Sequence, residues 1–312
     1  MRRRTWLRLL EWVAGLVVLA AIGRYLVREW DNLAARPWDI DWALLAAGSG
    51  LVILAYSGFV LLWRQLVSRL GARLSVIDAH RVWYFGNLAR YVPGKVLQLA
   101  GTAYLARAKG IGAVLTVGSI VVAQLFVIAA GLAVTLATLP GAPFPVPGGA
   151  ATGLVVAVLL VLLLLTPLFD LLYGLALRLT GREQPRLRLP VGTRLGLLIG
   201  YVATWIVFGL GFALFVVAVA EPTGSTPTLI GICAAGYLAG WVAVFVPGGL
   251  GVREGMYALL LAELMPGPVA AAVAVLSRLW LTGVEVLVAV VLALRYGFRD
   301  LRASTASVSE TR

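Results

Sequence analysis

Long apolar runs recur along most of this 312-residue chain, with shorter polar segments between them. A helix needs about 20 apolar residues to cross the roughly 30 Å of hydrocarbon in a bilayer. Six runs are long enough to predict membrane-spanning helices: Leu7 to Val27, Trp42 to Trp63, Ala113 to Leu139, Ala150 to Leu172, Leu195 to Ala220 and Val269 to Leu294. The first run also fits an uncleaved signal peptide, because its clean apolar core is short and follows "MRRR". We expect an all-α polytopic membrane protein.

Two further apolar stretches contain helix breaks. Val76 to Lys109 carries several polar residues around "YVPGK", and Thr228 to Met265 is interrupted by "PGGLGVREG". Proline removes a helical hydrogen bond and glycine relaxes the backbone, so each Pro-Gly is expected to end one half-helix. Irregular backbone at membrane depth is tolerated only inside protein or beside water, which predicts two re-entrant helical hairpins. The predicted breaks lie at Pro93, Gly94, Pro247, Gly248, Gly249 and Gly251.

The two broken stretches resemble each other. At a constant offset of 154 residues, eight of the 23 positions from Gly86 to Ala108 match their partners, including Gly86 with Gly240 and Pro93 with Pro247. Interrupted helices at equivalent places of two halves mark binding sites near the bilayer midplane in many transporters. The sequence therefore predicts an inverted-topology repeat, with about six full spans and two hairpins.

Composition and charge support this topology. Hydrophobic residues make up 61% of the chain and charged residues 13%, against about a quarter in soluble domains. If the N-terminus is cytoplasmic, 21 of the 26 Lys and Arg residues fall on the cytoplasmic side, as the positive-inside rule requires. We expect a multi-pass protein of the plasma membrane with both termini in the cytoplasm. The net charge of +12 then needs no nucleic acid as a partner.

Several ionisable residues fall in membrane-embedded segments, where a charge costs about 2.5 to 3.5 kcal/mol at the bilayer centre even on the lower scales. Three of them, Arg278, Thr282 and Glu285, are spaced to share one face of a helix. A cation-rich site suits an anion, so these residues are candidates for binding a lipid head group. The alternatives are ion pairs between Arg253 and Glu254 and between Arg278 and Glu285, and basic side chains that reach the head groups. The candidate residues are Arg90, Lys95, Arg253, Glu254, Arg278 and Glu285.

Signs of catalysis are scarce. One histidine, one cysteine (Cys233) and scattered acids give no metal-ligand spacing, no activated nucleophile and no phosphate-binding loop. We therefore expect no enzyme activity, no metal and no cofactor.

The motifs "NLARYVPGK" and "PGGLGVREG", followed by a last span with "LSRLW", resemble the flippase-like family that forms the transmembrane domain of lysylphosphatidylglycerol synthases. The resemblance covers most of the chain. It implies a polytopic domain with re-entrant helices that moves or handles a lipid, such as an aminoacylated phosphatidylglycerol, from the inner to the outer leaflet. It directs attention to the helix breaks and to Arg90, Lys95, Arg253 and Glu254.

Full synthases continue into a soluble aminoacyl-transfer domain, whereas this chain ends in "STASVSETR". We expect one transmembrane domain over residues 1–300, a cytoplasmic tail over 301–312, and no synthesis of lysyl-lipid. The preferred function is a translocase for a lipid with an anionic or phosphate-containing head. A membrane-embedded lipid-phosphate transferase and a non-transporting scaffold for a lipid-modifying enzyme stay open. The expected partners are membrane lipids, with a second copy of the chain or a separate lipid-modifying enzyme as alternatives.

Overall fold

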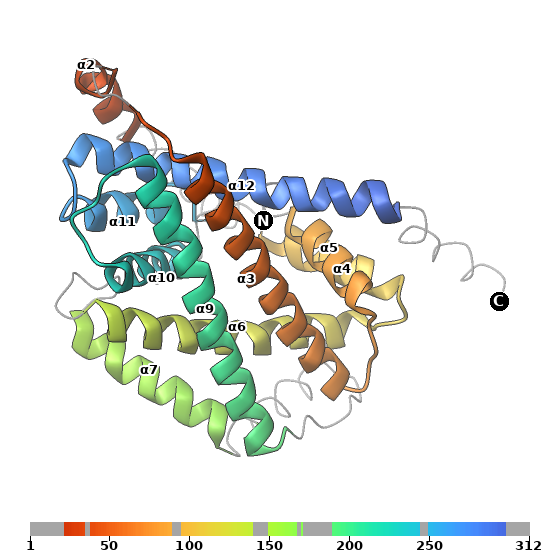
Figure 1. The fold of residues 1–312 in the computed structure, drawn as a ribbon. Helices are drawn as coiled ribbons and strands as arrows, with labels where there is room; N and C mark the ends of the chain where they lie inside the picture. The colour runs from red at the N-terminus through yellow and green to blue at the C-terminus, as the bar shows by residue number, and fades with distance from the viewer. Residues whose placement is uncertain are drawn as a thin grey trace, which may run out of the picture. The chain divides into compact units, whose positions relative to one another are not determined.

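The structure is a computed structural model that describes residues 22–34, 38–88, 95–139, 149–166, 170, 189–243 and 249–297 (Figure 1). Every regular element among these residues is an α-helix, and residues 22–28 are helical as well. The labelled helices are α2 (Trp30–Ala34), α3 (Trp42–Arg69), α4 (Val76–Leu88), α5 (Lys95–Arg107), α6 (Ala113–Thr138), α7 (Gly149–Leu165), α9 (Val191–Val219), α10 (Thr226–Val242), α11 (Val252–Leu261) and α12 (Gly267–Tyr296).

The long helices coincide with the apolar runs of the sequence. Four of them, α3, α6, α9 and α12, are long and apolar enough to cross a membrane. They cover the predicted spans that begin at Trp42, Ala113, Leu195 and Val269. Most of the first predicted span lies outside the described residues. An all-helical polytopic architecture is therefore present in the described part of the chain.

The fourth predicted span gives a shorter helix than its apolar run suggests. Helix α7 ends at Leu165, and Thr166 forms a bend. The buried guanidinium of Arg194 donates hydrogen bonds to the carbonyl oxygens of Leu164 and Thr166, at 3.3 and 2.7 Å. The last carbonyls of a helix have no intrahelical donor, so a side chain that supplies donors lets the helix end there.

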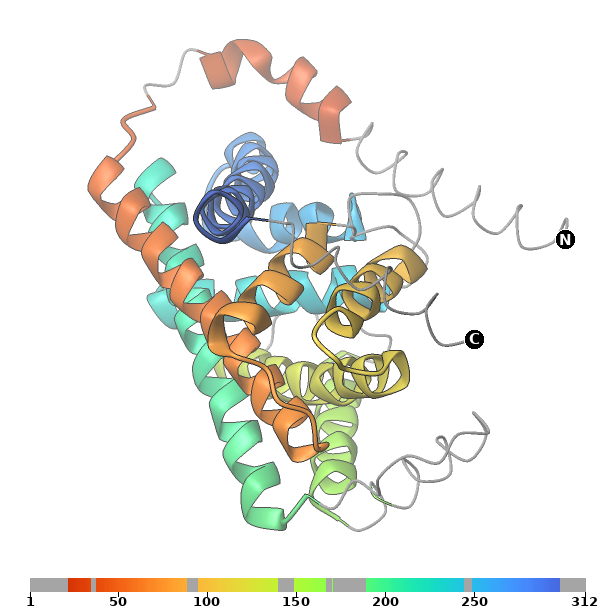
Figure 2. The ribbon, with the colours of Figure 1, turned by 90° about the vertical axis from the view of Figure 1, so that its right-hand side faces the viewer.

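Both interrupted stretches consist of two helices, as predicted. We call α4 with α5 hairpin 1, and α10 with α11 hairpin 2. In hairpin 1 the helices are interrupted between Leu88 and Lys95, and in hairpin 2 between Val242 and Val252. The two helices of each hairpin pack against each other (Figures 1 and 2).

The contacts inside each hairpin are antiparallel. In hairpin 1, Gly86 lies against Thr102 near the break, while Asp78 contacts Lys109 at the other end, which we call the mouth. In hairpin 2, Gly240 lies against Arg253 near the break, and further away the hydroxyl of Tyr257 donates to the carbonyl of Cys233. Contacts that pair earlier residues with later ones in this way require the chain to reverse direction at each break.

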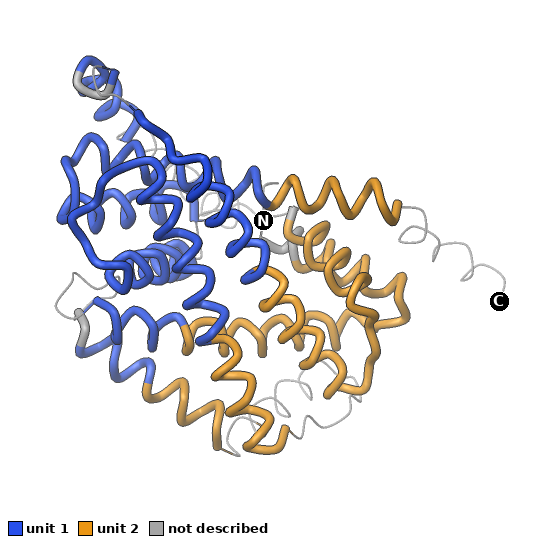
Figure 3. Tube along the Cα trace, in the orientation of Figure 1, with its two compact units in different colours: residues 1–55, 131–157, 202–284 blue, residues 56–130, 158–201, 285–312 orange. Residues whose placement is uncertain are grey.

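The helices gather into two compact units (Figure 3). Unit 1 comprises residues 1–55, 131–157 and 202–284, and unit 2 comprises 56–130, 158–201 and 285–312. Each of α3, α6, α7, α9 and α12 begins in one unit and ends in the other. Hairpin 1 lies wholly in unit 2 and hairpin 2 wholly in unit 1. The chain thus changes unit along every long helix and returns to the same unit through each hairpin.

Each unit buries its hairpin differently. In unit 1, α10 is buried along most of its length, and the ring of Phe212 from α9 packs on Tyr257 of α11 at a centroid distance of 4.9 Å. In unit 2, a core of Val60, Val67, Ala79, Ala106 and their neighbours joins the end of α3 to the mouth of hairpin 1. Small residues dominate α10, which lets neighbouring helices approach closely, as is usual in membrane proteins.

Candidate functional site

The break in hairpin 2 requires glycine at two described positions. Gly249 and Gly251 have φ angles of 66° and 82°, in the left-handed region that side chains rarely adopt. A Cβ atom on Gly249 would lie 2.8 Å from the Cα of Gly240, so a methyl group cannot be accommodated there. The predicted breaks at Pro247 and Gly248 lie outside the described residues. The glycines of "PGGLGVREG" thus set the backbone that starts α11.

Glu254 is tied into the start of α11. One carboxylate oxygen accepts the backbone N–H of Gly251 at 2.6 Å, which caps the helix N-terminus. The other accepts Nη1 of Arg278 from α12, also at 2.6 Å. Glu254 is 1% exposed, whereas the side chain of Arg278 is 20% exposed. This ion pair joins hairpin 2 to α12, and it was not among the pairs that the sequence suggested.

Arg253 lies between aromatic rings of hairpin 2. The centre of its guanidinium is 5.1 Å from the ring centroid of Tyr237 and 5.3 Å from that of Tyr257. Its Nε donates to the Tyr257 hydroxyl at 3.1 Å, and that hydroxyl donates to the carbonyl of Cys233 at 3.2 Å. Cation–π contacts with two rings hold a planar guanidinium in a fixed orientation. Arg253 is half-buried as a residue, and its Nη2 atom is buried.

Helix α12 carries the predicted polar face. Arg278, Thr282 and Glu285 all belong to this one continuous helix, so their spacing places them on one side of it. Glu285 is 2% exposed and belongs to unit 2. Arg278 belongs to unit 1 and pairs with Glu254. The residues of the polar face therefore belong to both units.

The remaining candidates belong to the break in hairpin 1. Arg90, Pro93 and Gly94 lie outside the described residues. Lys95 is the first residue of α5, and its side chain is not described. The structure therefore brings together Glu254 and Arg278, with Arg253 on the same helix as Glu254, and leaves the hairpin 1 candidates as predictions.

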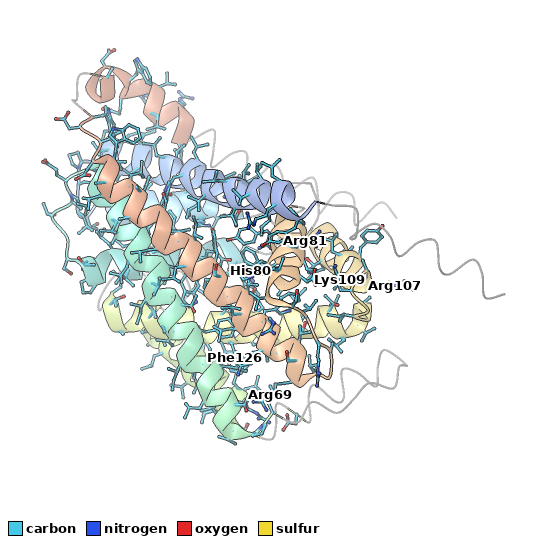
Figure 4. The ribbon with its side chains drawn as sticks, turned by 45° about the vertical axis from the view of Figure 1, so that its right-hand side comes forward. Arg69, His80, Arg81, Arg107, Lys109 and Phe126 are labelled. Atoms are coloured by element: carbon cyan, nitrogen blue, oxygen red, sulfur yellow. The ribbon has the colours of Figure 1, made fainter. Side chains whose placement is uncertain are left out.

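A second polar cluster, which the sequence analysis missed, lies at the mouth of hairpin 1 (Figure 4). Asp78 accepts Lys109 Nζ at 3.0 Å and Arg81 Nη1 at 3.5 Å. Arg81 is 3% exposed, and its Nη2 donates to the carbonyls of Tyr296 and Gly297 at 3.3 and 2.7 Å. These are the last carbonyls of α12, where a cation is favourable. The spacing of Asp78 and Arg81 is visible in the sequence, but the contact with α12 spans more than 200 residues.

The described charged groups of hairpin 2 are suited to binding an anion. Among the described residues, no three His, Cys, Asp or Glu side chains gather into a possible metal site. The charged groups of hairpin 2 are an arginine held by aromatic rings and an arginine held by a carboxylate. A guanidinium in such a setting suits an anionic group with several acceptor oxygens, such as a phosphate.

The four long apolar helices and the broken hairpins define a polytopic integral membrane protein. The chain belongs to the family of the lysylphosphatidylglycerol synthase transmembrane region, whose model matches residues 12–289. No individual curated protein matches the chain. Family membership indicates a membrane protein of lipid modification or transport.

Proposed function

We propose that this protein is a lipid translocase, which moves a lipid with an anionic or phosphate-containing head between the leaflets of the plasma membrane. The observation that carries the proposal is the path of the chain. Every long helix begins in one unit and ends in the other, whereas each hairpin begins and ends in the same unit. A hairpin that returns to its own unit is what a re-entrant element would give, and such hairpins form substrate sites in transporters built from inverted repeats.

The repeat-related glycines support the same arrangement. Gly86 and Gly240 correspond at the offset of 154 residues, and both lie where the two helices of a hairpin meet. A Cβ atom on Gly86 would collide with the side chain of Thr102. A Cβ atom on Gly240 would lie 3.1 Å from the Cβ of Arg253. Equivalent residues with equivalent packing are expected if the two hairpins are copies of one ancestral element.

The charges of the two units support a cytoplasmic C-terminus. The described acidic residues of unit 1 outnumber its basic ones, and unit 2 shows the reverse. Under the positive-inside rule, the end of α12 and the loop around residues 178–194 then face the cytoplasm. A cysteine placed in that loop of a Cys233→Ser protein should resist an impermeant thiol reagent added outside intact cells. Labelling from outside would reverse the topology.

In the proposed mechanism, Arg253 contacts the lipid head and Arg278 adds a second positive charge that Glu254 partly compensates. The N-terminus of α11 contributes its helix dipole, which also favours an anion. The acyl chains stay in the surrounding lipid. We propose no covalent step for the chain itself.

Leaflet-resolved movement of a labelled lipid in vesicles that contain the purified protein tests the proposal. An anionic head should cross faster than a zwitterionic one, and Arg253→Gln should slow it, with Arg253→Lys in between because lysine lacks the planar fork. Arg24→Gln is the matched control, because Arg24 is exposed. Formation of a new lipid product would identify a transferase instead. No movement, together with a co-purifying enzyme, would identify a scaffold.

A further inference from the structure

Several chain ends of unit 2 meet at the mouth of hairpin 1. The Nε of Arg64 near the end of α3 donates to the carbonyl of Leu74 at 2.7 Å, which ties α3 to the segment before α4. The Asp78–Lys109 ion pair ties the start of α4 to the end of α5, and Arg81 ties α4 to the end of α12. Ala106 and Ile111 share the apolar core with these segments. These chain ends therefore lie together at the mouth, and we call the surface that they form the basic face.

This face is strongly basic. Its exposed arginines are Arg69, Arg73, Arg107 and Arg295. The described acidic residues of unit 2 are Asp78, Asp170 and Glu285. Asp78 is already shared by Arg81 and Lys109, Asp170 pairs with Arg194, and Glu285 is buried. The positive charge at the mouth is therefore not balanced by carboxylates of the described chain.

Exposed apolar side chains accompany the arginines. Val76 and Ile77 begin α4 directly after the Arg73 segment, Tyr104 lies one helical turn before Arg107, and Tyr296 follows Arg295. Basic side chains mixed with protruding apolar and aromatic ones are typical of surfaces that contact the head-group region of a membrane. A soluble acidic protein or a nucleic acid would match the charge but would leave these apolar groups uncovered.

We propose that this basic face binds anionic phospholipid head groups, with Val76, Ile77 and Tyr104 inserted beside them. The positive-inside rule explains why arginines stay on this side of the membrane. The exposed apolar side chains beside them indicate, in addition, that the arginines contact the lipid surface itself. The inference rests on the proposed function for one point, namely that this face lies in the cytoplasmic leaflet. Anionic lipid would then gather beside hairpin 1.

The test measures lipid binding without transport, so its outcome is independent of translocase activity. The purified protein in detergent is titrated with phosphatidylglycerol or phosphatidylcholine, and thermal stabilisation and retained lipid in native mass spectrometry are recorded. Arg69→Gln with Arg107→Gln should lower the preference for phosphatidylglycerol by roughly 25-fold, because each basic residue near an anionic surface contributes about fivefold. The matched control is Arg24→Gln with Arg28→Gln, two exposed arginines of unit 1.

Three outcomes would overturn the inference. The two double variants could lose the preference equally, which would indicate net charge rather than a site. Inorganic phosphate at matched ionic strength could compete as well as the lipid, which would indicate a simple anion site. Polyglutamate could bind more tightly than phosphatidylglycerol, which would indicate an acidic protein partner. If the protein binds phosphatidylglycerol as proposed but moves no lipid in vesicles, the lipid-binding role of this face stands and only the translocase proposal fails.

Discussion

Hairpin 1 and hairpin 2 share a glycine at the same repeat position but are held together by different interactions. Hairpin 2 is packed by glycines along α10 and is joined to α12 by the Glu254–Arg278 pair, in which Glu254 is buried. Its mouth is closed by uncharged contacts, in which the backbone N–H and the hydroxyl of Thr223 both donate to the carbonyl of Leu264 at 3.0 Å. Hairpin 1 is closed at its mouth by the charges of Asp78, Arg81 and Lys109.

This difference predicts which hairpin is sensitive to ionic strength. Steric packing and buried pairs are insensitive to salt, whereas partly exposed ion pairs are screened by it. We therefore expect hairpin 2 to be the rigid element and hairpin 1 to loosen as ionic strength rises. Four predictions test this contrast. Three are measured as changes in the free energy of unfolding in detergent, and one is measured by amide hydrogen exchange.

The largest effect is expected at the buried pair of hairpin 2. Arg278→Gln leaves the carboxylate of Glu254 buried without its charged partner, which should cost roughly 3 to 5 kcal/mol. Glu254→Gln should cost less, because Arg278 is more exposed and glutamine can still cap α11. The double variant should be clearly more stable than the sum of the single effects implies. Strictly additive effects would mean that the two residues do not stabilise each other.

The next effect concerns the buried arginine of hairpin 1. Arg81→Gln removes charge-assisted hydrogen bonds to the carbonyls of Tyr296 and Gly297, of which the shorter one, to Gly297, is worth about 1.5 to 3 kcal/mol. Amide hydrogen exchange should accelerate in the last turn of α12, and it should stay unchanged in the exposed control Arg69→Gln. Equal exchange in the two variants would show that Arg81 does not anchor α12.

Two glycine-to-alanine substitutions distinguish the effect of close packing at a glycine from the effect of its low helix propensity. Gly236→Ala in α10 should destabilise the protein by about 1 to 3 kcal/mol, because the new Cβ would overlap the ring of Tyr257. Gly196→Ala in α9 meets no neighbouring atom within 4 Å and should be neutral or stabilising, since alanine favours helices by up to about 1 kcal/mol. If both variants gained stability, α10 and α11 would not be in close contact.

The smallest effect, and the most diagnostic one, is expected at the mouth of hairpin 1. Lys109→Gln should cost only about 0.2 to 1 kcal/mol, because its pair with Asp78 is partly exposed. The cost should shrink when salt rises from about 0.05 M to about 0.5 M, whereas the cost of Gly236→Ala should stay constant. A salt-independent effect at Lys109 would remove the distinction between the two hairpins.

Hydropathy predicted the main helices, because the bilayer forces apolar runs into helices, and the Pro-Gly motifs predicted that two stretches are each divided into two helices. Trp42, Ala113 and Thr228 all lie at or near the helix starts that the sequence indicated. The partner of Arg278 could not be predicted in this way. Glu254 reaches it only because α11 and α12 pack together, and any of several acids in the sequence satisfies the same charge argument.

Contacts between side chains and backbone carbonyls could not be predicted from the sequence either. Arg81 and Arg194 are two of many basic residues near helix ends, and their sequence spacing gives no indication of which carbonyls they contact. Gly249 and Gly251 were expected to relax the chain, and the structure adds the φ angles and the contact with Gly240 that make glycine necessary. Tertiary packing supplied this information, which no local pattern contains.

Helix α7 ends early, where Arg194 binds its last carbonyls, and this short length has a consequence for the membrane itself. Seventeen residues of helix are roughly 26 Å long, a few ångström less than the hydrocarbon thickness of an average bilayer. Most of the outer surface of α7 is apolar and exposed, so lipid surrounds it. Acyl chains beside this helix must shorten, or the helix must stand close to the bilayer normal, to avoid hydrophobic mismatch. Lipid chain length is thus expected to matter more for α7 than for the four longer helices, which have 26 to 30 residues.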